Sequence, residues 1–237
     1  MSSPSNHVPL EITRYIAVQP LFRGINDDDL ARIVDHGCSL VRVPRCRNLF
    51  SAGDICDSLH IVITGRIKVF ALAANGSEKV LELIGPGQSL GESAIFNDQR
   101  HGFSALSLSD SLLLRIPKAA LVAQIGRDPN FSLRLLAQAS QRIQNLLHDV
   151  ESYCLHSGLQ RVVGFLLKGQ SDESCAPARP HTVSLPVSKA TIASRLSLTP
   201  EYFSRVLREL EDEGLIQISR RDIHILQPRE LASYTLQ

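Results

Sequence analysis

The apolar residues of this chain change their spacing at Pro117, and no other feature limits the possible folds as strongly. From Val41 to Pro117, valine, isoleucine, leucine and phenylalanine alternate with polar residues in short runs separated by glycines, which is typical of half-buried antiparallel strands. Beyond Pro117 the apolar residues recur at every third or fourth position, which is the helical period. The sequence therefore predicts an α+β chain in which a barrel or sandwich of strands precedes a set of helices.

A long helix is predicted from about Asn130 to Leu155, and its apolar positions form one continuous seam. The seam consists of Leu136, Ala139, Ile143, Leu146, Leu147 and Val150. Such a seam can be buried in the core of one domain or against a second copy of the same helix. Because this helix stands between a β region and a helical region, we expect it to form the contact between the two subunits of a homodimer.

The order of elements at the C-terminus is typical of a winged helix-turn-helix. The segment TIASRLSLTPEYFSRVLRELEDEGLI, residues 191–216, predicts a short helix, a turn, and a longer helix that starts at Pro200 with Thr199 as its N-cap. The next segment, LIQISRRDIHIL, predicts two short strands joined by a charged turn. A fold of this kind places the first turns of its second helix in the DNA major groove.

Three polar residues of the second helix are candidates for reading DNA bases, namely Glu201, Ser204 and Arg205. Their spacing of three and four places them on one face. Arg205 can donate two hydrogen bonds to guanine and Glu201 can accept one from cytosine, so together they can read one G·C pair. The alternative is an ordinary surface ion pair between the two side chains. Candidates for contacts to DNA phosphates are Lys189, Thr191, Thr199 and Arg221.

The composition argues against several other classes of protein. The chain has 25 Lys and Arg against 24 Asp and Glu, so any DNA-binding surface must be a local basic patch. No apolar run reaches the roughly 20 residues that cross a bilayer, and the N-terminus lacks the pattern of a signal peptide, so we expect a cytoplasmic protein without a membrane partner. No nucleophile with a base, phosphate loop or metal-ligand spacing is found, which argues against an enzyme.

Together these motifs resemble the CRP/FNR superfamily of bacterial transcription regulators, which contains the cyclic-AMP receptor protein and the fumarate-nitrate reduction regulator. FSAGD, ITGRIKVF and GPGQSLGE resemble the glycine-punctuated β-roll of its cyclic-nucleotide-binding-type domain. The resemblance implies a flexible lead and helix start over residues 1–20, a β-roll sensor domain over 21–126, a dimerisation helix over 127–156, and a winged helix-turn-helix DNA-binding domain over 157–237.

Within this superfamily, PEYFSR most resembles the branch of the fumarate-nitrate and dissimilatory nitrate respiration (Dnr-like) regulators. That resemblance implies a palindromic promoter site in double-stranded DNA, similar to TTGAT-N4-ATCAA. The cyclic-AMP branch has an additional arginine before the glutamate, where this chain has Pro200, so a TGTGA half-site should bind less well. RNA polymerase is the expected further partner, and the loop from Gly169 to His181 is either its contact site or a solvated linker.

The same resemblance argues against cyclic AMP as the effector. Cyclic-AMP-binding members have a Gly-Glu pair and, further along the chain, an Arg-Ser pair whose arginine neutralises the phosphate. Gly91 and Glu92 match the first pair and are the candidate effector-pocket residues, but Gly102 and Phe103 stand at the second. Arg100 is close in sequence but would need a rearranged loop, and an unpaired phosphate is costly to bury. We therefore expect Glu92 to cap backbone amides at the pocket.

The resemblance also bears on the cofactor. Iron–sulfur ligation needs closely spaced cysteines, and Cys38, Cys46 and Cys56 are too far apart, so small buried side chains are the better interpretation. Nitrate respiration regulators respond to nitric oxide through haem, which makes haem-bound nitric oxide the leading signal. The candidate axial ligands are His36, His60 and His101. The alternatives are a cyclic-nucleotide-responsive activator and, from another class, a nucleotide-binding regulatory subunit of a partner enzyme.

Overall fold

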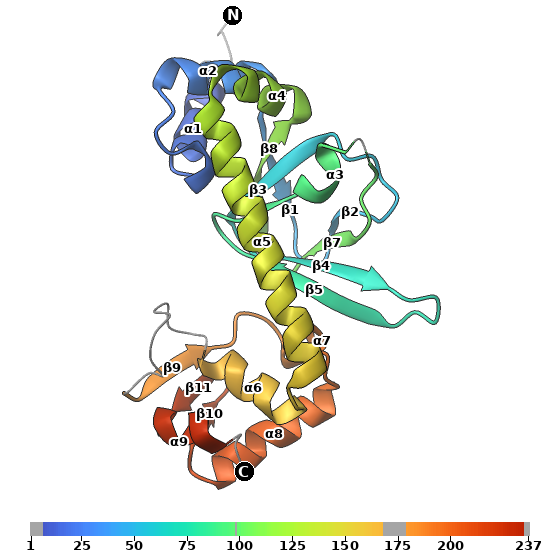
Figure 1. Cartoon of the computed structure of the whole chain (residues 1–237), viewed down its shortest axis with the longest axis vertical. Coiled ribbons are helices and arrows are strands. Elements are labelled where there is room, and N and C mark those ends of the chain that lie inside the picture. Colours follow the sequence, from blue (N-terminus) through green and yellow to red (C-terminus); the bar gives the residue numbers. More distant parts are fainter. Residues whose placement is uncertain (1–6, 98, 168–178, 235–237) are drawn as a thin grey trace, which may run out of the picture. The chain divides into compact units, whose positions relative to one another are not determined.

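The structure is a computed structural model that describes residues 7–97, 99–167 and 179–234 (Figure 1). The chain divides into two compact units, Met1–Gln144 and Asn145–Gln237. The first unit contains two β-sheets and the second contains one, and each unit has its own buried residues. Each unit therefore has its own fold.

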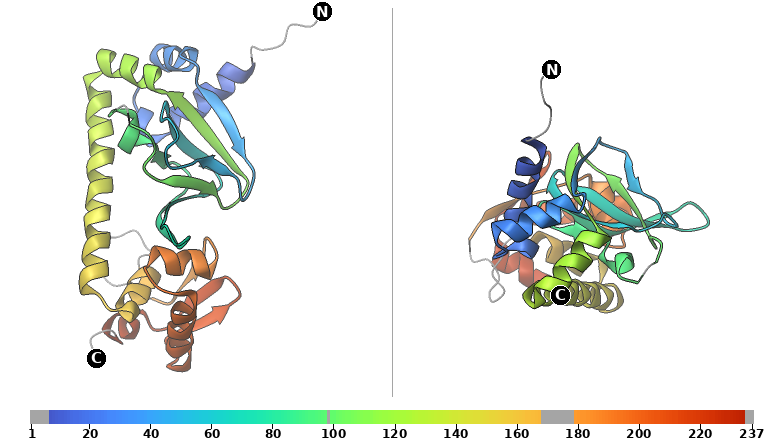
Figure 2. Two further views of the ribbon diagram at one scale, coloured as in Figure 1. Left: turned by 90° about the vertical axis from the view of Figure 1, so that its right-hand side faces the viewer. Right: turned by 90° about the horizontal axis from the view of Figure 1, so that it is seen from above.

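The first unit is built around a roll of two four-stranded antiparallel sheets (Figure 2). One sheet has the order β1 (Ser39–Val43), β8 (Ser111–Pro117), β3 (Ser58–Thr64) and β6 (Ser89–Leu90). The other has the order β2 (Asn48–Phe50), β7 (Ser104–Ser107), β4 (Ile67–Leu72) and β5 (Glu78–Ile84). Because side chains alternate between the two faces of a strand, about every second residue points into the roll. The core formed there consists of Val43, Val62, Ile67, Val69, Ile84, Leu90, Ala105 and Leu113.

Helices pack on the outer face of the first sheet. They are α1 (His7–Ala17), a short 3-10 helix (Pro20–Phe22), α2 (Asp27–Asp35), α3 (Glu92–Ile95) and α4 (Lys118–Arg127). Leu59 and Ile61 of β3 point to this side and pack in one core with apolar residues of the helices. Asn26 starts α2, because its side chain accepts a hydrogen bond from the backbone N–H of Asp29 at 2.8 Å.

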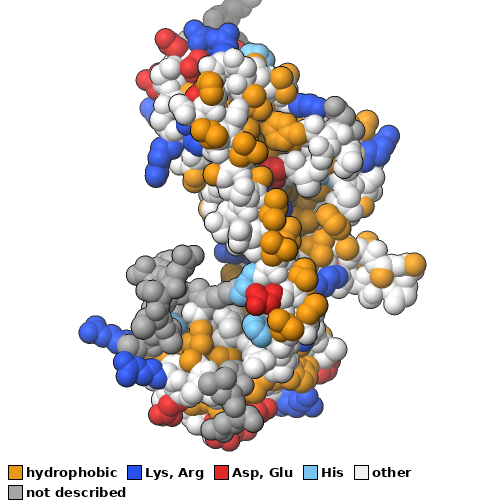
Figure 3. Space-filling model, viewed as in Figure 1, with side chains coloured by type: hydrophobic (Ala, Val, Ile, Leu, Met, Phe, Trp, Pro, Cys, Tyr) orange, Lys and Arg blue, Asp and Glu red, His pale blue; other side chains and the backbone are white. Residues whose placement is uncertain are grey.

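The helix α5 (Pro129–Leu155) begins in the first unit and ends in the second, and apolar side chains follow it on the surface (Figure 3). Its start and end agree with the predicted bounds to within one residue. Phe131 is buried against Phe22, with ring centroids 5.4 Å apart, and Arg134 Nε donates to the carbonyl of Leu21 at 2.9 Å. These contacts fix the first turns of α5 to the helical side of the first unit.

The second unit has the order of elements predicted for a winged helix-turn-helix. They are α6 (Gly158–Leu167), β9 (His181–Ser184), α7 (Lys189–Arg195), α8 (Pro200–Asp212), β10 (Ile216–Ser219), β11 (Asp222–Ile225) and α9 (Pro228–Ser233). The three strands form one sheet of order β10-β11-β9. The predicted α+β architecture, with a strand domain, a long helix and a winged helix-turn-helix, is confirmed. None of the described helices combines the length and the apolar content that crossing a bilayer requires.

Candidate nucleic-acid interface and sensor site

Hydroxyl side chains start both helices of the helix-turn-helix. Thr199, the predicted N-cap of α8, accepts a hydrogen bond from the Tyr202 N–H at 3.2 Å, and Pro200 is the first helical residue. Ser188 starts α7 in the same way by accepting from the Thr191 N–H at 3.2 Å. Caps of this kind satisfy N–H groups that have no partner inside the helix. The starting points of α7 and α8 are therefore set by local sequence.

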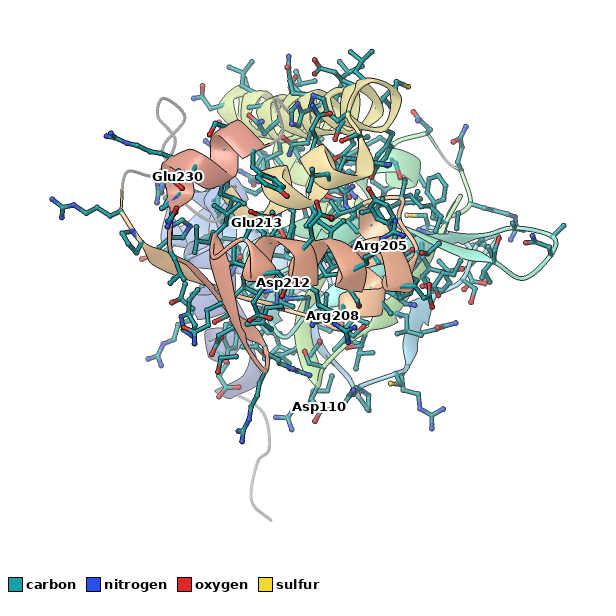
Figure 4. All side chains as sticks on the ribbon, turned by 90° about the horizontal axis from the view of Figure 1, so that it is seen from below. Asp110, Arg205, Arg208, Asp212, Glu213 and Glu230 are labelled. Atoms are coloured by element: carbon teal, nitrogen blue, oxygen red, sulfur yellow. The ribbon has the colours of Figure 1, made fainter. Side chains whose placement is uncertain are left out.

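The exposed edge of α8 carries the three residues predicted to read bases. Glu201 and Arg205 are exposed, and Ser204 is half-buried. Together with Pro200 and Arg208 they line an open hollow of about 420 Å³. Figure 4 shows Arg205 and Arg208 along this helix. Arg208 is not among the predicted residues, although its spacing of three from Arg205 puts it on the same face.

The opposite face of α8 is apolar and fixes the orientation of the exposed edge. Its buried residues are Phe203, Val206, Leu207 and Leu210. A rotation of α8 about its axis would expose these side chains to water, at a cost of about 1.5–3 kcal/mol for each. The direction of Glu201 and Arg205 is therefore set by packing within the unit.

The two charged residues of this edge do not pair with each other. In the described part of the chain, Glu201 and Arg205 form no ion pair with each other. The structure therefore does not support the alternative interpretation of a surface ion pair. The guanidinium carbon of Arg205 instead lies 4.9 Å from the centroid of the Tyr202 ring, which is a cation–π distance. Both charged groups thus remain open to a ligand.

The candidates for phosphate contacts come from three elements. Lys189 is the first residue of α7, Thr191 lies in its first turn, Thr199 caps α8, and Arg221 is exposed in the turn between β10 and β11. Helix starts favour negative charge because their backbone N–H groups point outward. These positions suit phosphate oxygens, which orient a protein on DNA without specifying bases.

Polar contacts that sequence reasoning did not find join the end of α5 to the helix-turn-helix. Arg195, at the end of α7, donates to Asp149 Oδ2 and to the Tyr153 hydroxyl, each at 2.5 Å. Tyr153 in turn donates to the carbonyl of Arg195 at 2.6 Å, and Arg161 of α6 donates to the carbonyl of Leu196 at 2.8 Å. Burial raises the pKa of Tyr153, so its hydroxyl keeps its proton. The turn between α7 and α8 is thereby held by α5 and α6.

The predicted seam of α5 is exposed in the single chain. Its members are Leu136 (62% exposed), Ala139, Ile143 (57%), Leu146, Leu147 (61%) and Val150. An apolar face of this kind on a chain's surface marks an interaction site. Because the spacing of three and four keeps these residues on one face, a second α-helix can cover them together.

Glu92, one of the two candidate effector-pocket residues, is neutralised from within the first unit. Gly91 precedes it with a φ of 110°, and a Cβ there would lie 3.0 Å from the carbonyl oxygen of Ser58, so the position needs glycine. Arg142 of α5 donates from Nη1 to Glu92 Oε2 at 3.0 Å and also pairs with Glu82 of β5. An ion pair therefore takes the place of the expected capping of backbone amides by Glu92.

The positions that match the Arg-Ser pair of cyclic-AMP pockets hold Gly102 and Phe103, and both are exposed. The neighbouring Arg100 donates from Nη1 to the carbonyl of Gly53 at 2.8 Å and forms an isolated β-bridge with Ile55. Its guanidinium is therefore engaged by the turn after β2. A phosphate in this region would have to displace that contact to gain a positive partner from Arg100.

Two of the three candidate haem ligands lie inside the roll. His60 of β3 and His101 are buried, with ring centroids 6.4 Å and 3.6 Å from that of Phe50. Burial, with smaller contributions from Arg115 and His101, lowers the pKa of His60 to about 4, so this ring is neutral near pH 7. Its Nδ1 is buried and has no hydrogen-bond partner among the described residues. His36 is exposed instead, with its Nδ1 2.7 Å from a backbone carbonyl of α2.

The cysteines behave as separate side chains. Cys38 and Cys56 are buried in the helical-side core, as expected. Cys46, which the sequence also predicts to be buried, is exposed, and so is Cys154. Burial raises the pKa of Cys38 to about 12 and also raises that of Cys56, which keeps both thiols protonated and fits small buried side chains. In the part of the chain that the structure describes, no three or more His, Cys, Asp or Glu residues gather so that they could hold a metal ion.

Two segments of the chain match known protein families. Residues 40–128 match the family described as cyclic nucleotide-binding domain, and residues 160–234 match the family described as Crp-like helix-turn-helix domain. The first match contains Gly91 and Glu92 together with His60 and His101, and the second contains the whole exposed edge of α8.

Known proteins are similar over most of the chain. The "Probable transcriptional regulator flp" of Lacticaseibacillus casei is 27% identical over 218 residues, which are 92% of this chain and 96% of that protein. The cyclic AMP receptor protein of Thermus thermophilus is 24% identical over 209 residues, 87% of this chain and 92% of that protein. The structure of FixK2 from Bradyrhizobium japonicum superposes with a TM-score of 0.72 at 19% identity, covering 82% of this chain and 95% of that one. At this identity the structural likeness concerns the fold alone.

Proposed function

The chain belongs to the CRP/FNR superfamily of DNA-binding transcription regulators, and from this premise we propose that it is a homodimer that reads a TTGAT-like palindrome. The observation that carries the proposal is the exposed edge of α8, where Glu201, Ser204 and Arg205 share a face opposite to the buried one. A dimer bound at a promoter would then contact RNA polymerase. Most of the proposed contact loop, Gly169 to His181, lies outside the described residues.

The chemistry of this edge suits a G·C pair. Arg205 can donate two hydrogen bonds to guanine O6 and N7, while Glu201 accepts from the cytosine amine. Ser204 and Arg208 flank the two on the same face. Pro200 has no side-chain donor at the position where the cyclic-AMP branch has its additional arginine, which favours TTGAT over TGTGA half-sites.

The seam of α5 supports the homodimer. Two copies of an exposed apolar helix face can bury each other about a two-fold axis. Two-fold symmetry of the protein matches two-fold symmetry of a palindrome, in which the two recognition helices enter successive major grooves one helical turn apart. The TTGAT-N4-ATCAA site has this symmetry.

Haem-bound nitric oxide is the proposed signal, by resemblance to the Dnr-like branch. His60 is the residue that would hold the iron, because its ring is neutral and its buried Nδ1 has no hydrogen-bond partner among the described residues. When bound, haem would supply an iron that takes nitric oxide. The apolar side chains of the roll interior would exclude water around it, and the Phe50 ring already stacks against His101 in the same region.

A cyclic-nucleotide-responsive activator is the second candidate, because residues 40–128 match the cyclic nucleotide-binding domain family. Two contacts weigh against it. Arg142 already neutralises Glu92, and Arg100 is engaged with the Gly53 carbonyl. A nucleotide-binding subunit of a partner enzyme, the alternative from another class, would have no use for the exposed edge of α8.

Fluorescence anisotropy on a TTGAT-N4-ATCAA duplex tests the proposal, without oxygen and at fixed salt. The protein is measured alone, with ferrous haem, with ferrous haem plus nitric oxide, and with cyclic AMP. Arg205→Ala should weaken binding about 5- to 150-fold, because a bidentate arginine–guanine contact contributes about 1–3 kcal/mol. Arg127→Ala removes an exposed arginine of α4, serves as the matched control, and should bind like the wild type.

Each result has a separate meaning. Tight binding only with haem and nitric oxide, lost in Arg205→Ala, supports the recognition edge and the signal together. Binding that depends on Arg205 but ignores haem and nitric oxide keeps the regulator and excludes that signal, and an increase with cyclic AMP alone favours the second candidate. Equal binding by Arg205→Ala and the wild type would refute the assignment of Arg205.

A further inference from the structure

Tyr202 lies between the candidate base-reading arginine and the start of another helix. Its ring is half-buried and lies directly against Gly158, the first residue of α6. A Cβ added to Gly158 would approach Tyr202 Cε1 to 2.5 Å, and the Cζ and Oη atoms to 2.8 Å. Gly158 does not adopt the left-handed conformation, so a side chain there would conflict with the Tyr202 ring and not with the backbone angles, and the ring would have to shift to accommodate it.

Arg205 lies over the same ring. The guanidinium carbon lies 4.9 Å from the ring centroid, and the spacing of three residues on one helix keeps the two side chains together. The backbone N–H of Tyr202 is fixed as well, since it donates to the Thr199 hydroxyl that caps α8. Tyr202 is thus fixed at its backbone N–H and lies in close contact with Gly158, and the Arg205 guanidinium lies over its ring.

We infer that Tyr202 is a positioning residue for base recognition, a role that rests on the proposed reading of guanine by Arg205. The N–H donors of a guanidinium lie in its plane, so a contact through its face with an aromatic ring leaves these donors free to reach the edge of a base. Stacking also restricts the rotamers of the arginine side chain before DNA binds, so less conformational entropy is lost on binding. Tyr202 therefore increases affinity for the G·C pair in particular, without touching the DNA itself.

The test compares two duplexes, TTGAT-N4-ATCAA and TTAAT-N4-ATTAA, in which the guanine read by Arg205 is replaced. Tyr202→Leu should weaken binding to the first duplex about 3- to 30-fold and leave binding to the second nearly unchanged. Tyr202→Phe keeps the ring and should restore discrimination to within about 2-fold of the wild type. Thermal unfolding of each variant, followed by circular dichroism, separates a loss of fold from a loss of discrimination.

Gly158→Ala gives an independent variant that leaves the sequence of α8 intact. The new methyl group must displace the Tyr202 ring, so discrimination between the two duplexes should fall as it does in Tyr202→Leu. If Tyr202→Leu does not fold, this variant decides alone. Discrimination equal to the wild type in folded Gly158→Ala or Tyr202→Leu would overturn the inference.

A double-mutant cycle with Arg205→Ala shows through which residue Tyr202 acts. If Tyr202 positions Arg205, adding Tyr202→Leu to Arg205→Ala should cause no further loss. An equal loss in both backgrounds would make Tyr202 merely structural. Should Arg205→Ala itself lose no affinity, the proposed function of Arg205 fails, whereas a loss in Arg205→Ala without one in Tyr202→Leu refutes only the positioning role.

Discussion

His60 is a titratable side chain in an apolar interior, and this position couples folding to pH. Its pKa of about 4 in the folded chain lies below the ordinary value of 6.5. The unfolded chain therefore binds a proton below pH 6.5 that the folded chain does not. The stability contributed by the neutral ring is fully present above pH 6.5 and is lost as the pH falls toward 4. Burial lowers the pKa of His101 in the same direction.

We expect the free energy of unfolding to fall by up to about 1.4 kcal/mol per pH unit for His60 between those limits. Urea unfolding at several pH values and one protein concentration measures this slope. His60→Leu should reduce the slope of the free energy of unfolding against pH, whatever the absolute stability of the variant. His36→Gln changes an exposed residue and should leave this slope unchanged. An unchanged slope in His60→Leu would show that other groups cause the acid sensitivity.

The sequence alone does not distinguish among His36, His60 and His101 as candidate haem ligands, because the burial pattern of β3 is not a simple alternation. Its residues SLHIV are buried on both faces, so the alternation that normally separates inside from outside is missing. Leu59 and Ile61 point to the helices, while His60 and Val62 point into the roll. In α8 the polar and apolar faces differ clearly, and the placement of Glu201 and Arg205 on the exposed edge followed directly.

The helix α5 has different roles on its different faces. One face carries the exposed apolar seam, while Arg142, Asp149 and Tyr153 bind groups of the same chain. The period of apolar residues predicts the seam. It does not predict the polar contacts, because the partners Glu92 and Arg195 are distant in sequence and only the folded chain brings them to α5.

Ile143→Glu should dissociate the proposed dimer, because each dimer would then bury two new charges in an apolar contact. We expect the dissociation constant to rise about 100-fold or more. Gln144→Glu is the matched control, because Gln144 follows Ile143 on the helix, is rotated from it by about 100° about the helix axis, and lies outside the seam. Analytical ultracentrifugation over a concentration series measures both, and a dimer of unchanged affinity in Ile143→Glu would place the contact elsewhere.

The proposed dimer and the proposed palindrome must share one symmetry. If the seam holds two subunits together, the two α8 helices can bind at the same time only to half-sites whose major grooves face the same side of the duplex. Adding five base pairs to the spacer turns one half-site by about half a helical turn. Affinity should then fall at least about 100-fold, toward the level of non-specific DNA.

Anisotropy on the two spacer lengths measures this loss. Ile143→Glu provides the control, because a monomer reads one half-site and should bind both duplexes equally weakly. Equal affinity of the wild type for both spacers would mean that the reading helices are not held in a fixed relation.

Across related chains, the residues at the positions of Gly158 and Tyr202 should change together. An aromatic ring at the second position needs the gap left at the first, whereas a smaller residue there would allow the first to carry a side chain. The substitution history of these two distant positions would then record when the guanine-reading arginine acquired its aromatic support. Lineages without the ring should have replaced that support or become more tolerant of other bases.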